Sequence, residues 1–459
     1  MKNNITKINL STNQKDSFEN IIKQIEDIVK INMPWDNMIS LSGAAGTGKT
    51  FLITHIIKYL QEKYSITVTA PTHKAVKVIR DNFEKNNIKS IELKTIHSFL
   101  NIKLFTDYVN GSQIFKPDKT KKDLSKTDIL IIDESSMVSS ELFEYIEETI
   151  LQDRVKVILF VGDYYQLLPV DSKKNKVFDI RHQYKLNEIV RQAKDSYIIN
   201  IASQVRELIK NKNYVDLQSF FFKNKNLDIE FFSDENSFYE NFYKNQNWDC
   251  EDKIITSYSN KSIDHHNNII RRRYWQERGI YNPEVLRVGD KLILQDAYTK
   301  NNTTILQNNQ EVVLTSAEKV YFEKIDIYYW ICKNEQGVDF QIVDPLSLDK
   351  YNNILKTIAN NAKQEKNYEQ RTNLWKQFYR IKDFFVSVKY SFASTIHKLQ
   401  GSTYETVYID LLFLSRYNKI DNDELYRLIY VAITRASKDI KILIHSTQNE
   451  IEDIFAEYT

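Results

Sequence analysis

Apolar residues in the N-terminal part of the chain follow the spacing of helices and strands in alternation. Between Gln14 and Ile31 they recur at every third or fourth position, and Ser11 or Thr12 precedes them as a capping residue, which predicts a helix. Strands that alternate with helices predict a parallel sheet with right-handed crossovers. The further expected elements lie at 38–41, 50–59, 66–70, 73–83, 129–132, 140–150 and 155–161.

The same alternation returns in the second half of the chain. We expect a strand at 254–258, a helix at 263–275, and strands at 386–390 and 406–411. The chain is therefore predicted to contain a second α/β region, which would pack its own strands and helices around a separate core.

A hairpin pattern interrupts the first α/β region. Strand-like runs at 104–109 and 113–115 flank Asn110-Gly111. This pair readily adopts the positive φ angles of a tight turn. Residues 98–126 are therefore predicted to form an inserted β-hairpin.

A second interruption lies in the later α/β region. Residues 286–343 contain strand-like runs with polar turns and little helical pattern, so we expect a small inserted β domain there. Residues 345–384 are predicted to be mostly helical. Four of their apolar residues share one helix face, which we interpret as core packing: Leu374, Trp375, Phe378 and Tyr379.

Length and composition limit the classes of protein to consider. The 459 residues exceed a single compact core and predict two to four domains. The 63 basic residues nearly balance the 61 acidic ones, so a surface for nucleic acid would have to be a local groove. Cys250 and Cys332 lack metal-ligand spacing, and neither a disulfide framework, a zinc site, a secretory signal nor a membrane span is expected.

Residues 43–50 carry a specific chemical motif. They fit G-x-x-x-x-G-K-[ST] between a predicted strand and a predicted helix, the context that a phosphate-binding P-loop requires. Backbone N–H groups and the helix N-terminus would surround the phosphates, Lys49 would reach the β and γ phosphates, and Thr50 would hold Mg²⁺. The loop consists of Gly43, Ala44, Ala45, Gly46, Thr47, Gly48, Lys49 and Thr50.

An acidic pair supplies the second centre that a P-loop needs. Asp133 and Glu134 directly follow the apolar run 129–132, so both carboxylates are expected at the end of a buried strand. Asp133 would hold the hydration shell of Mg²⁺, and Glu134 would orient or deprotonate the attacking water. These features together predict an ATPase.

Six further segments narrow this class. They are APTHKA at 70–75, TIHSF at 95–99, VGDYYQLLPV at 161–170, LNEIVRQ at 186–192, STIHKLQGS at 394–402 and YVAITRA at 430–436. With the P-loop and the acidic pair, their order resembles that of superfamily 1 helicases, in the RecD-like branch of superfamily 1B and especially the phage Dda helicases. The resemblance extends over nearly the whole chain.

The resemblance implies roles around the nucleotide. Gln14 would read the adenine edge, and Gln166 would sense the γ-phosphate, although Leu168-Pro169 replaces the two prolines that the family commonly has beside it. Arg191 and Arg435 would supply arginines to the transferring phosphate. Gly401 belongs to the motif that couples bound strand to nucleotide.

The resemblance also implies contacts with a nucleic-acid strand. Hydroxyl and basic donors at element ends suit phosphates, and an aromatic ring suits stacking on a base. The residues assigned to DNA binding are Pro71, Thr72, His73, Lys74, Thr95, His97, Phe99, Thr395, His397 and Lys398.

The fold implied by the resemblance is α/β, with two RecA-like P-loop lobes, an inserted β-hairpin called the pin and an inserted SH3-like β subdomain. The expected boundaries are 1–97 and 127–190 for lobe 1A, 98–126 for the pin, 191–285 and 385–459 for lobe 2A, and 286–384 for the SH3-like insert with its helical extension.

The function implied is that of an ATP-dependent DNA helicase, with ATP and Mg²⁺ as cofactors and single-stranded DNA and duplex junctions as partners. The direction, 5′ to 3′, rests on the resemblance alone. An RNA helicase or remodeller of the same superfamily, a nucleotide-switched binding module and the motor subunit of a nuclease complex stay open as alternatives. We expect a monomer in a bacterial or phage-infected cytoplasm, in contact with replication or recombination proteins.

Overall fold

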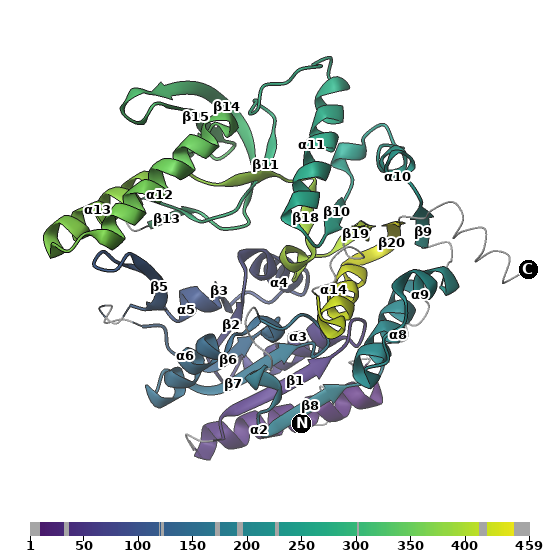
Figure 1. Cartoon of the computed structure of the whole chain (residues 1–459). Coiled ribbons are helices and arrows are strands. Elements are labelled where there is room, and N and C mark those ends of the chain that lie inside the picture. The colour runs from purple at the N-terminus through teal and green to yellow at the C-terminus, as the bar shows by residue number, and fades with distance from the viewer. Residues whose placement is uncertain are drawn as a thin grey trace, which may run out of the picture. The chain divides into compact units, whose positions relative to one another are not determined.

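The chain folds into two compact units, here in a computed structural model (Figure 1). The first unit comprises Met1–Ile102, Pro117–Tyr258 and Thr395–Thr459, and the second comprises Lys103–Lys116 and Ser259–Ser394. The second unit is therefore built from two inserts in the sequence of the first. The structure describes residues 10–31, 36–118, 120, 124–169, 175–190, 196–224, 229–300, 303–412 and 420–444.

A six-stranded sheet organises the N-terminal lobe of the first unit. Its order is β3-β2-β6-β7-β1-β8, and every neighbouring pair is parallel. The strands are β1 (Met38–Gly43), β2 (Ile66–Ala70), β3 (Glu92–Thr95), β6 (Thr127–Ile132), β7 (Val155–Gly162) and β8 (His182–Leu186).

Helices cover both faces of this sheet because its strands are apolar on both sides. Along β6, Ile129 and Ile131 join the core beneath α2, α3 and α4, whereas Leu130 and Ile132 join the core beneath α6. Alternation of this kind follows from the period of two residues along a strand. The helices are α2 (Thr12–Ile31), α3 (Lys49–Leu60), α4 (His73–Lys85), the short α5 (Ile96–Phe99) and α6 (Ser140–Leu151).

A second sheet organises the other lobe of the first unit. Its order is β18-β10-β19-β20-β9, with parallel pairing from β10 to β9. Its strands are β9 (Ile229–Phe232), β10 (Lys253–Ser257), β18 (Ala393–Thr395), β19 (Tyr404–Asp410) and β20 (Ala436–Leu443). The helices of this lobe are α8 (Tyr197–Asn211), α9 (Leu217–Lys223), α10 (Glu235–Phe242) and α14 (Asn422–Thr434).

The second unit is built around antiparallel strands. Its main sheet has the order β16-β15-β14-β11-β17, and every neighbouring pair is antiparallel. The strands are β11 (Lys291–Leu294), β12 (Tyr298–Lys300), β13 (Thr303–Leu306), β14 (Glu311–Phe322), β15 (Ile327–Asn334), β16 (Asp339–Val343) and β17 (Val388–Tyr390). The helices are α11 (Asn260–Gln276), α12 (Leu348–Gln364) and α13 (Tyr368–Lys382).

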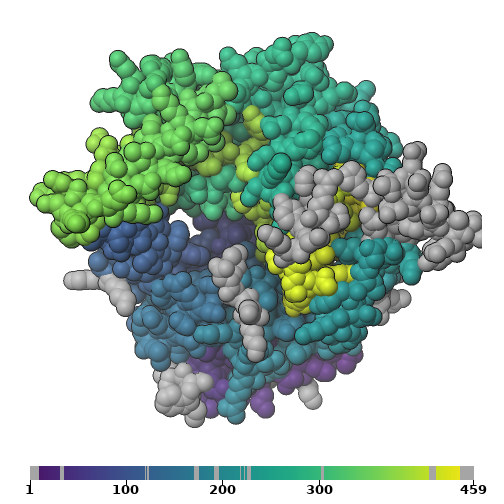
Figure 2. Space-filling model, viewed as in Figure 1, coloured from purple at the N-terminus to yellow at the C-terminus, as the bar shows by residue number. Residues whose placement is uncertain are grey.

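The predicted hairpin is present, and its tip has an unexpected partner. Strands β4 (Ile102–Asp107) and β5 (Ser112–Pro117) form a two-stranded sheet. The Tyr379 hydroxyl donates a hydrogen bond to the carbonyl oxygen of Gly111 at 2.7 Å. A Cβ atom on Gly111, where φ is +72°, would lie 2.2 Å from the ring of Trp375. The aromatic face of α13 therefore packs on the tip of the hairpin as well as on α12. In Figure 2, the light green atoms of the helical region lie against blue atoms of the hairpin region.

The structure confirms the predicted fold class of parallel α/β lobes with a hairpin and an antiparallel β insert. The predicted helix at 263–275 lies within α11. Among the described residues, no helix is both long and apolar enough to cross a membrane.

Candidate active site

The P-loop connects β1 to α3 in a tight turn. Gly48 precedes α3 with φ at +78°, a backbone conformation that favours glycine. A Cβ atom on Gly43 would lie 2.5 Å from Oγ1 of Thr47, whose hydroxyl donates to the carbonyl oxygen of Ala44 at 2.8 Å. These close approaches explain why small residues occupy the loop.

Lys49 points into the curve of the P-loop. Its Nζ donates to the carbonyl oxygens of Gly43 at 2.6 Å and of Ala44 at 3.1 Å. A cavity of about 410 Å³ opens beside it, lined by the loop, by Thr50 and by residues of α3 and α4. The ammonium group thus lies where phosphates would meet the N-terminus of α3.

The acidic pair lies at the end of β6, on the same edge of the sheet as the P-loop. Because β6, β7 and β1 are parallel neighbours, their carboxyl ends meet there. Desolvation, then the charge of Glu134, raises the pKa of Asp133 to about 6, while the charge of Lys49 acts in the opposite direction. Glu134 has φ at +50°, which is rare for a residue with a side chain. Such strain often occurs at functional sites.

Asn175 was missed by the sequence analysis. Its buried side-chain amide donates to the carbonyl oxygens of Ser135 at 3.2 Å and of Ser136 at 2.9 Å. These residues form the turn directly after Glu134, so Asn175 holds that turn in place. Asn175 lies outside the recognised motifs, and nothing in its sequence context pointed to this pairing.

Residues of the second lobe, which is the other lobe of the first unit, lie next to the acidic pair. A Cβ atom on Gly401 would lie 3.2 Å from Cβ of Ala75 and 3.9 Å from Cγ of Glu134. Gly401 therefore lies against both Glu134 and the start of α4. Gln166 is 5% exposed, and its Oε1 has no hydrogen-bond partner among the described residues. An unpaired buried acceptor costs about 1–3 kcal/mol, so this amide is a good candidate for a ligand contact.

The other residues assigned to the nucleotide differ in their placement. The Gln14 side chain donates to the carbonyl oxygen of Thr47 at 3.0 Å, which puts it against the back of the P-loop. The Arg435 guanidinium is buried in its own lobe and donates to the carbonyl oxygens of Ser402 and Val431. Arg191 lies outside the described residues.

The residues assigned to DNA binding differ in their hydrogen-bond partners and in their exposure. Lys74 donates to the hydroxyl of Tyr404 at 2.6 Å, so it joins the two lobes of the first unit. The Thr72 and Thr95 hydroxyls accept backbone N–H groups as helix caps, and Pro71 and His73 lie beside Thr72. The remaining members with exposed or half-exposed side chains are His97, His397 and Lys398, whereas Thr395 is buried.

The expectation that Phe99 stacks on a base is not met. Its ring is 1% exposed, and it packs in the core between the sheet and α6. The guanidinium of Arg154 covers the ring at 5.4 Å and donates to the Phe99 carbonyl oxygen at 2.9 Å. Phe99 is therefore a core residue in this structure.

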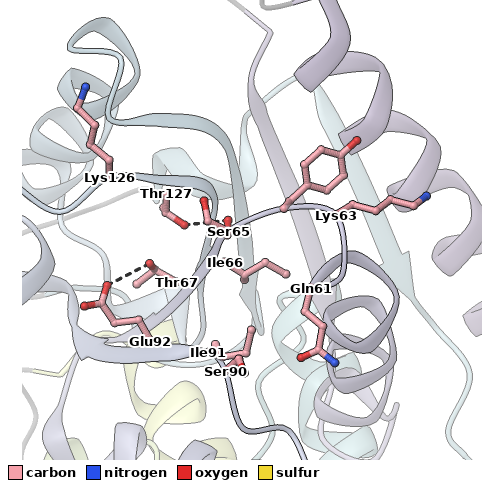
Figure 3. Close-up of a pocket in the computed structure, with 11 residues that line it drawn as sticks. Gln61, Lys63, Ser65, Ile66, Thr67, Ser90, Ile91, Glu92, Lys126 and Thr127 are labelled. Carbon is pink, nitrogen blue, oxygen red and sulfur yellow. Dashed lines mark hydrogen bonds between the residues drawn. The ribbon is translucent and has the colours of Figure 1, made fainter.

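A larger hollow of about 480 Å³ lies at the opposite edge of the first sheet (Figure 3). It is lined by the amino ends of β2, β3 and β6. Thr67 and Glu92 face each other there and share a hydrogen bond of 3.3 Å. Because ligands of parallel α/β sheets bind at the carboxyl ends of the strands, this hollow is not the nucleotide site.

The P-loop, the acidic pair and Gly401, in the turn before β19 of the second parallel sheet, define the class: a P-loop nucleotide triphosphatase with two RecA-like lobes. Residues 26–172 match the family model of an AAA domain, and residues 390–442 match that of the UvrD-like helicase C-terminal domain.

Known proteins are similar over nearly the whole chain. The ATP-dependent DNA helicase Dda of Enterobacteria phage T4 is 27% identical, over 94% of this chain and 98% of its own. The RecD subunit of the RecBCD enzyme of Buchnera aphidicola is 25% identical, over 89% of this chain and 70% of its own. A crystal structure of Pif1 helicase from Bacteroides with ADP-AlF3 and ssDNA has the same fold, with a TM-score of 0.50, 16% identity and coverage of 98% and 97%. These matches support a superfamily 1B helicase of the Pif1, RecD and Dda type.

Proposed function

We propose that this chain is an ATP-dependent DNA helicase that moves along single-stranded DNA from 5′ to 3′ and separates duplex DNA. The observation that carries the proposal is the position of Gly401, which lies against both Glu134 and Ala75. Its motif belongs to the second lobe, whereas Glu134 and Ala75 belong to the first. Hydrolysis and strand binding then depend on the same junction between lobes.

The residues of the first lobe can hold and activate a nucleotide. Backbone N–H groups of the P-loop and Nζ of Lys49 would bind the phosphates. Thr50 and Asp133 offer oxygen donors of the kind that Mg²⁺ prefers, and bound Mg²⁺ would neutralise charge on the phosphates. Glu134 would orient the attacking water and accept its proton. Gln166 would donate the N–H groups of its side-chain amide to the γ-phosphate, and its unpaired Oε1 would be left to accept a hydrogen bond from water.

The second lobe would complete the site when the lobes close. Arg435, with Arg191, would stabilise charge on the transferring phosphoryl group. Arg435 now bonds to Ser402 within its own lobe, so its contribution would require it to exchange that partner for phosphate. A guanidinium suits this exchange because it keeps its charge and offers several donors.

The hairpin of the second unit would act as the pin that divides the strands. Phe115, Ile114 and Leu104 are 58%, 51% and 45% exposed, so apolar side chains face solvent on a narrow β-ribbon. Apolar side chains of this kind can replace a stacked base at a junction. The contact between Gly111 and α13 would keep the ribbon rigid while the strands part.

Unwinding of tailed duplexes tests this proposal. The unaltered chain should separate a 5′-tailed DNA duplex only with ATP and Mg²⁺, and Lys49→Ala should abolish the activity. Unwinding of a 3′-tailed duplex alone would overturn the direction. Unwinding of an RNA duplex in preference to DNA would favour the RNA helicase, and strand-independent ATPase activity without unwinding would favour the nucleotide switch.

A further inference from the structure

The loop after β7, residues 163–167, is rooted in the first lobe and packed into the second. Leu167 is 4% exposed and belongs to the apolar core that α8 and α14 form. Tyr165 packs against the same core. Gln166 lies between them, so the position of its side chain depends on both lobes.

Arg427 of α14 holds the backbone of this loop. Its Nη1 donates to the carbonyl oxygens of Tyr164 at 2.7 Å and of Gln166 at 2.9 Å. Its Nε donates to Asp423 at 2.6 Å, which fixes the guanidinium on the helix. Hydrogen bonds from a buried cation are stronger than neutral ones, so the loop should follow α14 when that helix moves.

Tyr430 lies one helical turn further along α14 and is 1% exposed. Its hydroxyl donates to Oδ2 of Asp163 at 2.6 Å and accepts the backbone N–H of Ala45 at 3.3 Å. Burial, and then the charge of Asp163, raise the pKa of Tyr430, so the hydroxyl keeps its proton. One side chain of the second lobe therefore links the P-loop to the first residue of the Gln166 loop.

We propose that Tyr430 is a positioning residue for ATP hydrolysis. Tyr430 couples the orientation of α14 to the P-loop and to the loop that carries Gln166. This inference rests on the proposed function as an ATP-driven motor. When α14 shifts, the hydroxyl must release or regain Asp163 and the N–H of Ala45 together. Gln166 is then correctly placed only in the lobe arrangement in which Tyr430 makes both bonds.

Tyr426 provides a matched control for a change at Tyr430. It lies one turn earlier on α14, is also 1% exposed, and its hydroxyl donates to the carbonyl oxygen of Val215 within the second lobe. Tyr430→Phe and Tyr426→Phe each remove one buried hydroxyl and keep the ring. Both should lower the unfolding temperature by similar amounts.

The kinetics of the two variants decide the proposal. Tyr430→Phe should lower kcat for ATP hydrolysis about tenfold or more, with KM for ATP within about twofold, because bound nucleotide is held by other groups. Tyr426→Phe should keep kcat near that of the unaltered chain. An unchanged kcat in Tyr430→Phe, or equal losses in both variants, would overturn the role of Tyr430.

A double-mutant cycle tests the route of action. If Tyr430 acts through Asp163, then Tyr430→Phe should add little to the loss caused by Asp163→Asn. If the double variant loses kcat by the product of the two single losses, that route is overturned. Both comparisons measure basal and DNA-stimulated ATP hydrolysis. If DNA does not stimulate hydrolysis by the unaltered chain, the proposed function is contradicted. The basal rates still decide the role of Tyr430 in that case.

Discussion

The two compact units differ in what holds them together and in what they present. In the first, polar groups gather at the carboxyl ends of parallel strands, where the P-loop, Asp133 and Glu134 meet. The second unit consists of antiparallel strands and helices. Its hairpin is held at Gly111 by contacts with Trp375 and Tyr379 of α13. Under the proposed function, ATP hydrolysis and strand separation would belong to different units, so changes in one unit should leave the task of the other intact.

Removal of the acidic group beside the phosphates should have the largest effect. Glu134→Gln keeps the shape of the side chain but cannot accept a proton, so ATP hydrolysis should fall by about 10²–10⁴-fold. Nucleotide binding should persist, because the P-loop and Lys49 are unchanged. Steady-state ATPase rates and binding of a fluorescent ATP analogue check this, with Glu62→Gln in the exposed turn after α3 as the control. Hydrolysis within twofold of the unaltered rate would contradict the role of Glu134.

A buried ion pair should determine the stability of the second unit. Asp290 is 2% exposed and accepts from Nε of Arg271 at 2.8 Å, Nη2 of Arg271 at 2.9 Å and Nε1 of Trp275 at 2.8 Å. Asp290→Ala would leave the buried guanidinium without its partner and should cost about 3–5 kcal/mol of unfolding free energy.

An exposed ion pair provides the control for Asp290. Glu405 and Lys438 approach to 2.7 Å but are 51% and 62% exposed, so Glu405→Ala should cost about 0–1 kcal/mol. Urea unfolding monitored by tryptophan fluorescence measures both variants. Equal losses would show that the Asp290 pair does not stabilise the second unit.

A methyl group on the hairpin tip should uncouple unwinding from hydrolysis. Gly111→Ala places Cβ in the ring of Trp375 and also strains a backbone with positive φ, so the tip should leave α13. Gly337→Ala imposes a similar backbone strain, at φ of +77°, with nothing within 4 Å, and serves as the control. Unwinding should fall several-fold in Gly111→Ala alone, while DNA-stimulated ATPase stays unchanged. Equal unwinding by both variants would contradict the bracing of the hairpin.

The smallest effect concerns the charge of the residues assigned to DNA binding. Lys398→Ala should reduce the slope of log affinity against log salt by about 0.7 for single-stranded DNA, since one phosphate contact is lost. Desolvation lowers the pKa of His397, so its ring is neutral at pH 7 and His397→Gln should leave that slope unchanged. Fluorescence anisotropy over a range of salt concentrations measures both slopes. A reduced slope in His397→Gln would contradict a neutral ring.

The sequence alone predicted those parts of the site that are local. The P-loop, the strand before Asp133 and the turn at Gly111 each depend on residues close together in the chain, so their patterns are readable. The pairs that organise the site are distant: Tyr430 and Asp163 are 267 positions apart, and Lys74 and Tyr404 are 330 apart. Such pairs follow from packing of whole lobes, which no local pattern encodes.

Burial explains one wrong expectation and one that is confirmed but incomplete. Phe99 ends a motif that suggested stacking on a base, but the sheet beneath it is apolar and the ring completes that core. Trp375 and Tyr379 pack in the core of the helical segment, as their spacing predicts, and they also hold the hairpin tip, a partner more than 260 positions away. A residue type and its spacing predict burial, whereas the partner is set by the tertiary fold.

Deletion of residues 107–113 tests the division of labour most directly. DNA-stimulated ATPase and unwinding of a 5′-tailed duplex should be measured together in the unaltered chain and in the deletion variant. We expect the unaltered chain to unwind the duplex with ATP, and the deletion variant to keep ATPase activity but lose unwinding. Unimpaired unwinding by the deletion variant, or no unwinding by the unaltered chain, would contradict this expectation.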